Sequence, residues 1–175
     1  MSYLIQSPEH TNGIQVDLPL PRAVPKTVNL ILAGTETTAT ALSGLIYYLL
    51  TNPRTLDQAV QEVRKTFQNP TDINIESTQG LKYLIACIHE SQRMYPSTPG
   101  TFPRRLPREG AIIRGRHVPG NTVVGIPYLA AFRSGDNFSN PDEYIPERWL
   151  RESSSDKRDA FHPFSFGPRI CIGKE

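Results

Sequence analysis

The spacing of hydrophobic and polar positions divides the chain into a helical part and a mixed part. Residues 26–50 are apolar almost all round, which predicts a helix surrounded by neighbours, and Asn52-Pro53 predicts its end. One apolar stripe opposite charged positions predicts an amphipathic helix over 54–67, a polar stretch over 69–77 predicts a loop, and 81–95 predicts a third helix. The positions expected to face inward on the two later helices are Leu56, Val60, Val63, Phe67, Leu81, Leu84, Ile85 and Ile88.

After Pro96 the period shortens, as strands require. Residues 111–113 and 117–118 flank Arg114-Gly115-Arg116, which predicts a short hairpin. The remaining expected segments are a strand over 122–126, a short apolar segment over 128–132 and an irregular polar segment over 136–158. The pattern predicts a mainly α fold with a small β portion, of the α+β class.

The start of the chain reads as a lead-in rather than a folded element. Four prolines lie within residues 1–25 and predict that no long helix forms there, so we expect a linker over 1–25 and one domain over 26–175. No apolar run marks a targeting or membrane segment at this end. Residues 28–50 are long enough to span a bilayer, but Glu36 and four threonines favour a buried helix in a soluble body, since a central acid costs about 2.5–3.5 kcal/mol in a membrane.

Composition narrows the function classes only in part. A chain of 175 residues with 38% hydrophobic and 21% charged residues is typical of a globular domain with a core. A net charge of +2 gives no reason to expect a nucleic-acid partner. Two cysteines outside any Cys-x-x-Cys pair indicate neither a zinc motif nor a disulfide framework, and favour a reducing compartment. Basic residues near the end fit an ordinary surface and a docking face for an acidic partner equally well.

The most specific pattern is Phe164-Ser165-Phe166-Gly167-Pro168-Arg169-Ile170-Cys171-Ile172-Gly173. Gly167 and Gly173 lack a Cβ, so the backbone can approach a flat ligand or take a positive φ. Arg169 can pair with a carboxylate on that ligand, and Phe164 can shield it from water. The arrangement suits a thiolate at Cys171 that binds an iron-bearing ring, whereas a turn holding an inert buried cysteine leaves five matched positions unexplained.

With these residues the chain resembles the cytochrome P-450 superfamily of haem-thiolate monooxygenases, whose signature is Phe-x-x-Gly-x-Arg-x-Cys-x-Gly. The resemblance implies that Cys171 is the axial ligand of haem b (iron protoporphyrin IX), where thiolate electron donation favours O–O cleavage. It also implies that Arg169 contacts a haem propionate. Pro103-Arg104-Arg105 falls where the family carries another propionate-binding arginine. Arg104 directly follows the proline and fits best, while Arg105 stays open.

A second motif, Ala33-Gly34-Thr35-Glu36-Thr37-Thr38, lies inside the long apolar helix. Glycine there costs roughly 0.5–1 kcal/mol relative to alanine, and Glu36 is expected to be a buried charge. Such penalties are typical of functional positions. The motif resembles the family's oxygen-activating helix, which implies that Gly34 leaves room for dioxygen while Glu36 and Thr37 relay protons. The structural alternative is a helix-packing glycine with a capping-type glutamate.

A third constellation combines two distant segments. Glu90 and Arg93 are spaced i, i+3 and share a helix face, although surface pairs of this kind contribute little. The family carries the same Glu-x-x-Arg, completed by an arginine from a later Pro-Glu-Arg, and 146–149 supplies Arg148. The resemblance implies a buried structural triad that fixes the cysteine loop, and loss of one member would leave a buried charge.

The motifs occur in family order over about 26–174. The residue sequences of 30–45, 94–105 and 146–150 look most like those of fungal family members that act in secondary metabolism. The resemblance implies O2- and NADPH-dependent oxidation of a small apolar organic substrate, a secondary metabolite, with electrons from a separate reductase. Full-length relatives lie on the cytosolic face of the endoplasmic reticulum membrane through an N-terminal anchor. We expect this chain to be a C-terminal-half fragment without the N-terminal half, that anchor or the final helix after Cys171, and therefore cytoplasmic if soluble.

Two other functions fit the same residues. A catalytically inactive remnant would keep the motifs by descent without a complete site. A soluble helical module would bind another protein through apolar positions that a short chain leaves partly exposed. These positions are Val28, Ile31, Leu42, Ile46 and Leu49.

Overall fold

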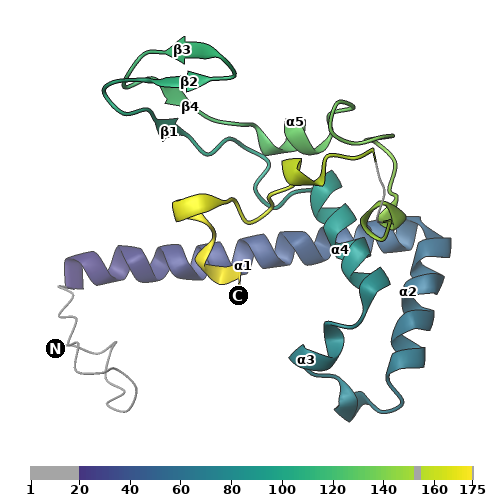
Figure 1. Cartoon of the computed structure of the whole chain (residues 1–175). Coiled ribbons are helices and arrows are strands. Elements are labelled where there is room, and N and C mark those ends of the chain that lie inside the picture. Colours follow the sequence, from purple (N-terminus) through teal and green to yellow (C-terminus); the bar gives the residue numbers. More distant parts are fainter. Residues whose placement is uncertain (1–19, 152–154, 175) are drawn as a thin grey trace.

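A 32-residue helix, α1 (Leu20–Thr51), is the longest element of the computed structural model, which describes residues 20–151 and 155–174 (Figure 1). The predicted start at residue 26 was wrong, because the helix begins at Leu20 and contains Pro25. Pro25 is the sixth residue of α1, so the helix loses one backbone hydrogen bond near its start and continues beyond it. The predicted end holds, since Pro53 begins the next helix. The rest of the expected lead-in, 1–19, lies outside the described residues.

Three further helices follow α1. They are α2 (Pro53–Thr66), α3 (Ile75–Thr78) and α4 (Lys82–Met94), with the 3-10 turn η1 (Pro70–Asp72) between the first two. The stretch expected to be a loop is therefore partly helical, because Asn69 and Asn74 each begin a capping box. Helix α4 packs against both α1 and α2. Their shared core consists of Ala59, Tyr83 and Cys87, with Leu45, Leu49 and Leu84 packed against it.

The buried face of α4 differs from the expected apolar stripe. Leu81 is buried, but Leu84, Ile85 and Ile88 are only half-buried. The fully buried positions along the helix are Tyr83, Ala86, Cys87, Glu90, Ser91, Arg93 and Met94. This face therefore carries charge into the interior.

The β portion is small, as predicted for the mainly α, α+β class. Strands β2 (Ala111–Ile113) and β3 (Arg116–Val118) form the expected hairpin. Its two-residue turn has φ of 48° at Arg114 and 78° at Gly115, the positive values that a type I′ hairpin turn requires. Strands β1 (Arg104–Arg105) and β4 (Val123–Val124) pair antiparallel, so the strand expected over 122–126 is shorter than predicted.

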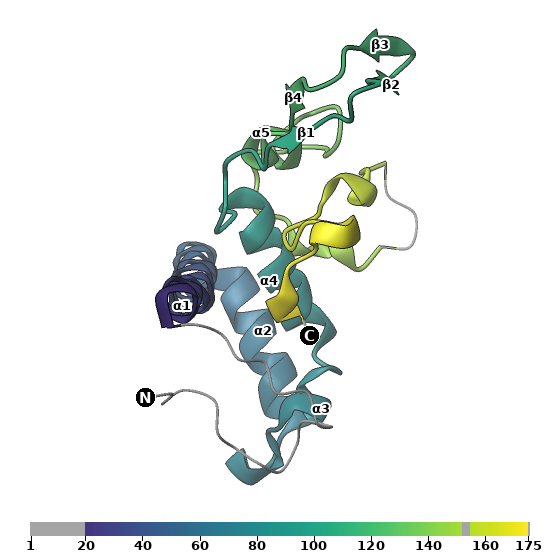
Figure 2. The same cartoon turned by 90° about the vertical axis from the view of Figure 1, so that its left-hand side faces the viewer.

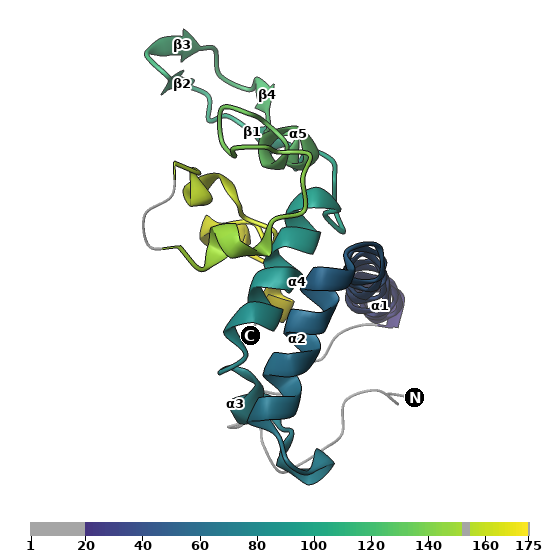
Figure 3. The same ribbon diagram turned by 90° about the vertical axis from the view of Figure 1, so that its right-hand side faces the viewer.

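The last third of the chain wraps around α4. The short apolar segment forms α5 (Tyr128–Phe132), followed by 3-10 turns η2 (Pro146–Trp149), η3 (Arg158–Ala160), η4 (Gly167–Arg169) and η5 (Ile172–Lys174). Figures 2 and 3 view the molecule along α1 and show α1 on one side of α4 and most of the 155–174 segment on the other, with the last turn, η5, overlapping α4. The β2–β3 hairpin extends away from this body in all three views. Within the described residues, no helix combines the length and apolar character needed to cross a membrane.

Candidate functional site

A buried carboxylate on α4, that of Glu90, is the centre of an ion cluster. Its two oxygens accept from Arg93 one turn later, with Nη2 to Oε1 at 2.9 Å and Nε to Oε2 at 3.0 Å. Both side chains are fully buried. The remaining donors of Arg93 bind the backbone carbonyls of Phe132, Pro141 and Glu143 at 2.7–3.1 Å. Helix α4 is thereby tied to α5 and to the loop before η2.

The second arginine reaches the same carboxylate from η2. Arg148 Nε donates to Glu90 Oε1 at 3.0 Å, and its Nη1 donates to Asp156 Oδ2 at 2.6 Å. The structure thus brings together the three residues of the expected triad and adds Asp156. Burial alone would lower the pKa of Arg148, but the two carboxylates raise it above its ordinary value.

Neutral donors and aromatic rings complete the cluster. Trp149 Nε1 donates to Glu90 Oε2 at 2.9 Å, and the Ile145 backbone N–H donates to Oε1 at 3.0 Å. The Arg93 guanidinium lies 5.3 Å from the centre of the Phe138 ring, within cation–π range. With five donors on two oxygens, the Glu90 charge is compensated on every side, which a buried carboxylate requires.

The cysteine loop follows this cluster in the chain. Cys171 is exposed, and its backbone N–H donates to the Phe164 carbonyl at 2.8 Å, which closes the loop. Gly167 has a φ of 71°, the left-handed value that its lack of a Cβ permits, whereas Gly173 has a φ of −89°. Arg169 is exposed and Phe164 is 38% exposed. The role of Phe164 as an apolar shield for a bound ring stays a prediction.

The α1 motif faces open space. A Cβ added at Gly34 would meet nothing within 4 Å, so Gly34 packs against no other element in the part of the chain that the structure describes. Glu36 is exposed, which corrects the expectation of a buried charge: residues 24–36 are exposed throughout. Thr37 is half-buried; its hydroxyl donates to the Ala33 carbonyl at 2.5 Å, and its carbonyl accepts from Ser97 Oγ at 2.8 Å.

The glycine that packs α1 against another element is Gly44, which the sequence did not single out. A Cβ there would lie 3.1 Å from Cδ1 of Tyr95. The two glycines of α1 therefore have different surroundings. Gly44 permits Tyr95 to approach α1 closely, and Gly34 leaves part of the helix surface without a side chain.

The candidate propionate arginine lies on strand β1. Arg104 pairs with Val124, is exposed, and its Nη1 donates to the Pro103 carbonyl at 3.0 Å. Its neighbour Arg105 points to the other face of the strand, because successive strand side chains alternate. The choice between the two arginines stays a prediction.

These residues fit a haem. Cys171 supplies one soft, accessible ligand on a loop that two positive-φ residues, Ser165 and Gly167, shape, and a porphyrin ring supplies the equatorial ligands itself. Exposed guanidinium groups at Arg169 and Arg104 suit anionic propionates. The other cysteine does not compete, because Cys87 is fully buried and burial raises the pKa of its thiol to about 12.

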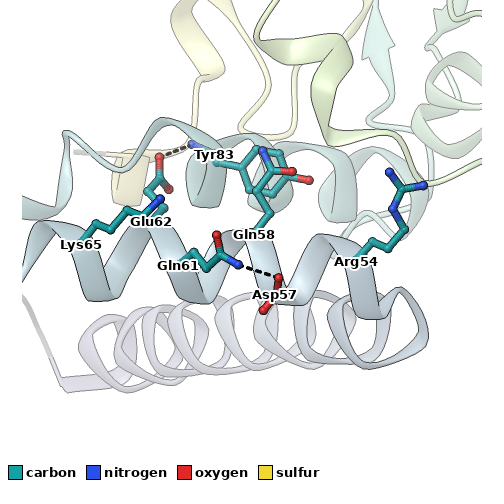
Figure 4. Close-up of a pocket in the computed structure, with 7 residues that line it drawn as sticks. All are labelled: Arg54, Asp57, Gln58, Gln61, Glu62, Lys65 and Tyr83. Atoms are coloured by element: carbon teal, nitrogen blue, oxygen red, sulfur yellow. Dashed lines mark hydrogen bonds between the residues drawn. The ribbon is translucent and has the colours of Figure 1, made fainter.

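A polar hollow lies elsewhere, between α2 and the start of α4 (Figure 4). Its lining residues are Arg54, Asp57, Gln58, Gln61, Glu62, Lys65 and Tyr83. None belongs to the motifs, and the mixed charges do not suit an apolar substrate. Glu62 has a structural role there, since its carboxylate accepts from the backbone N–H groups of Tyr83 and Leu84 at 2.9 Å and caps α4.

The sequence did not single out three residues that organise the site. Asp156 and Glu62 contact residues at sequence separations that match no helix or strand period, so no local pattern in the sequence marks them. Trp149 directly follows the Pro-Glu-Arg segment, and its position beside Arg148 was the available clue.

Comparison with known proteins agrees with this geometry. The sequence profile of the Cytochrome P450 family matches residues 1–175. The chain is similar to the cytochrome P450 monooxygenase astA of Talaromyces wortmannii, with 43% identity over 99% of the chain and 35% of that protein. It is also similar to the cytochrome P450 monooxygenases aclL of Aspergillus oryzae (48% identity, 83% of the chain, 30% of that protein) and alt3 of Alternaria solani (42% identity, 99% of the chain, 34% of that protein). The chain spans about a third of the length of these relatives.

Proposed function

The chain belongs to the cytochrome P450 family, and on that premise we propose that it carries the iron-ligand and oxygen-side elements of a haem-thiolate monooxygenase. The reaction would insert one oxygen atom from O2 into a small apolar organic substrate, a secondary metabolite, with electrons from NADPH through a separate reductase. The observation that carries the proposal is Cys171, an exposed thiol on a loop that its own backbone N–H closes.

The bound haem would supply oxygen activation, which the thiolate ligand favours. Cys171 would hold the iron, and the guanidinium groups of Arg169 and Arg104 would hold the propionates. Gly167 lets the loop turn with a positive φ, and a Cβ added at Gly173 would lie in ordinary van der Waals contact with Cys171 Sγ, at 3.8 Å. The bound ring would reduce the exposed area of the Phe164 side chain.

On the other side, Gly34 would leave room for dioxygen, since its surface is open. Glu36 is exposed to solvent and would be the outer residue of the proton relay. Thr37 would turn its hydroxyl from the Ala33 carbonyl and donate toward the site. Adjacent helix residues do not face each other, so a proton passing from Glu36 to Thr37 needs a bridging water.

Haem reconstitution tests the iron ligand. The full-length protein, loaded with haem and reduced under carbon monoxide, should develop the shifted Soret band of a haem-thiolate carbonyl complex, whereas the present chain alone is expected to hold haem poorly. Cys171→Ser should lose that band, whereas Cys87→Ala, which changes the buried thiol, should keep it. An unchanged band in Cys171→Ser would refute the assignment.

The oxygen-side role is tested in the full-length enzyme with its reductase. Thr37→Ala should consume NADPH without a matching amount of product, because proton delivery is lost while electron transfer continues. Unchanged coupling between NADPH and product would contradict the role of Thr37.

A further inference from the structure

The buried ion cluster is electrically balanced only when Asp156 is counted. Glu90 alone faces two guanidinium groups, those of Arg93 and Arg148, and all three side chains are at most 4% exposed. An excess positive charge in such a place is costly, because burial removes the water that would stabilise it. Asp156 brings a second carboxylate whose side chain is 2% exposed. The carboxylates of Glu90 and Asp156 then face the two buried guanidinium groups. The half-buried Arg158 donates to the Arg148 carbonyl.

Asp156 also binds a separate part of the chain. Its Oδ1 accepts from the Ser139 backbone N–H at 2.7 Å and from the Ser139 hydroxyl at 2.8 Å, while its Oδ2 accepts from Arg148. Arg148 in turn donates from Nη2 to the Asn140 carbonyl at 3.3 Å. The residue therefore joins the loop before η2, the η2 turn and the start of the last segment at one carboxylate.

That last segment leads directly to the cysteine. The Lys157 N–H donates to the Asn137 carbonyl at 2.7 Å, and the Phe161 ring lies 4.8 Å from that of Trp149 and 5.0 Å from that of Phe132. From there the chain turns into the 164–171 loop that the Cys171 N–H closes. Residues 156–161 are thus the fixed base from which the loop extends.

We propose that Asp156 is a positioning residue for Cys171, which balances the charge of the buried cluster and fixes the segment that carries the thiol. The inference rests on the proposed function in one respect: it takes Cys171 as the functional residue of the loop. Its test needs no haem, so its failure would be distinct from a failure of the proposed function.

Amide hydrogen exchange of the full chain tests the fixed segment. Asp156→Asn keeps the size and one acceptor but removes the charge, and exchange across 157–174 should become about tenfold faster or more, as expected for the loss of a charge-assisted hydrogen bond. Asp159→Asn makes the same change three residues later at an exposed position and should leave exchange unchanged. Equal exchange in the parent and in Asp156→Asn would overturn the proposal.

A charge rescue separates this role from simple loss of contacts. Arg148→Met combined with Asp156→Asn restores balance around the Glu90–Arg93 pair, so the urea midpoint of the double variant should fall by less than the sum of the two single losses. Strict additivity would overturn the charge-balance part. If Asp156→Asn does not fold, recovery of helical circular dichroism in the double variant supports the proposal, and an equally unfolded double variant overturns it.

Discussion

Replacing Glu90 by glutamine tests whether the cluster is the structural centre of this part of the fold. The substitution preserves volume but replaces one acceptor oxygen with an N–H2 group and removes the charge. Five donors meet this carboxylate, three of them from arginines. At least one donor would face the new N–H2 group, at about 1–3 kcal/mol for an unsatisfied buried group.

Arg148 would keep Asp156 as a carboxylate partner, whereas the described hydrogen bonds of Arg93 would be reduced to those with backbone carbonyls. Breaking a buried ion pair typically costs about 3–5 kcal/mol, whereas an exposed pair contributes about 0–1 kcal/mol. We expect Glu90→Gln to lose about 3–5 kcal/mol, a large share of the roughly 5–15 kcal/mol that stabilises a domain.

Urea unfolding followed by tryptophan fluorescence measures this loss at the site itself, because the only tryptophan, Trp149, donates to Glu90. Asp142→Asn is the matched control: its carboxylate forms an exposed bridge with Arg133 at 3.5 Å. A free energy of unfolding for Glu90→Gln that lies within about 1 kcal/mol of the Asp142→Asn value would refute the reasoning.

Three other measurements follow from the same contacts. Burial alone would raise the pKa of Asp156, but the backbone N–H and hydroxyl of Ser139 and the Arg148 guanidinium lower it to about 2. The ionised Asp156 should stabilise the fold by about 1–2 kcal/mol above pH 5 and lose that contribution between about pH 4 and 2. The difference in urea midpoint between the parent and Asp156→Asn should therefore shrink as the pH falls from about 4 to 2, and a constant difference would contradict this. A thiol reagent should label one cysteine of the native chain quickly, and mass spectrometry should locate the label at Cys171, because burial raises the pKa of Cys87 to about 12; labelling of both at equal rates would count against the described burial. Gly34→Ala should stabilise the chain by about 0.5–1 kcal/mol, while Gly44→Ala should gain less, because its Cβ would press on Tyr95 at 3.1 Å; an equal gain in thermal unfolding would be inconsistent with the contact.

Local rules predicted the elements whose causes are local. The hairpin over β2 and β3 follows from a glycine between two apolar runs, and Gly115 takes the positive φ that the turn needs. The end of α1 follows from Pro53, and the pairing of Glu90 with Arg93 follows from helix spacing. Each depends on residues within a few positions of one another.

The rest depended on contacts that no period encodes. Glu36 was expected to be buried because its helix is apolar all round, yet exposure depends on what packs against that stretch. The interior face of α4 carries Glu90 and Arg93 in place of an apolar stripe because distant carbonyls and Arg148 satisfy their charges. Asp156 reaches Arg148 from an irregular segment, where side-chain direction follows only from the folded backbone.

The wide separation of the cluster residues in the chain delays its assembly during synthesis. Glu90 and Arg148 are 58 positions apart, and translation at about 5–20 residues per second leaves roughly 3–12 seconds before the second arginine follows the first carboxylate. During that interval the Glu90 and Arg93 pair on α4 lacks Arg148, and the rings of Phe132 and Phe138 are not yet buried in a complete core. The nascent chain is therefore most open to chaperones and proteases in the seconds before Arg148 emerges from the ribosome.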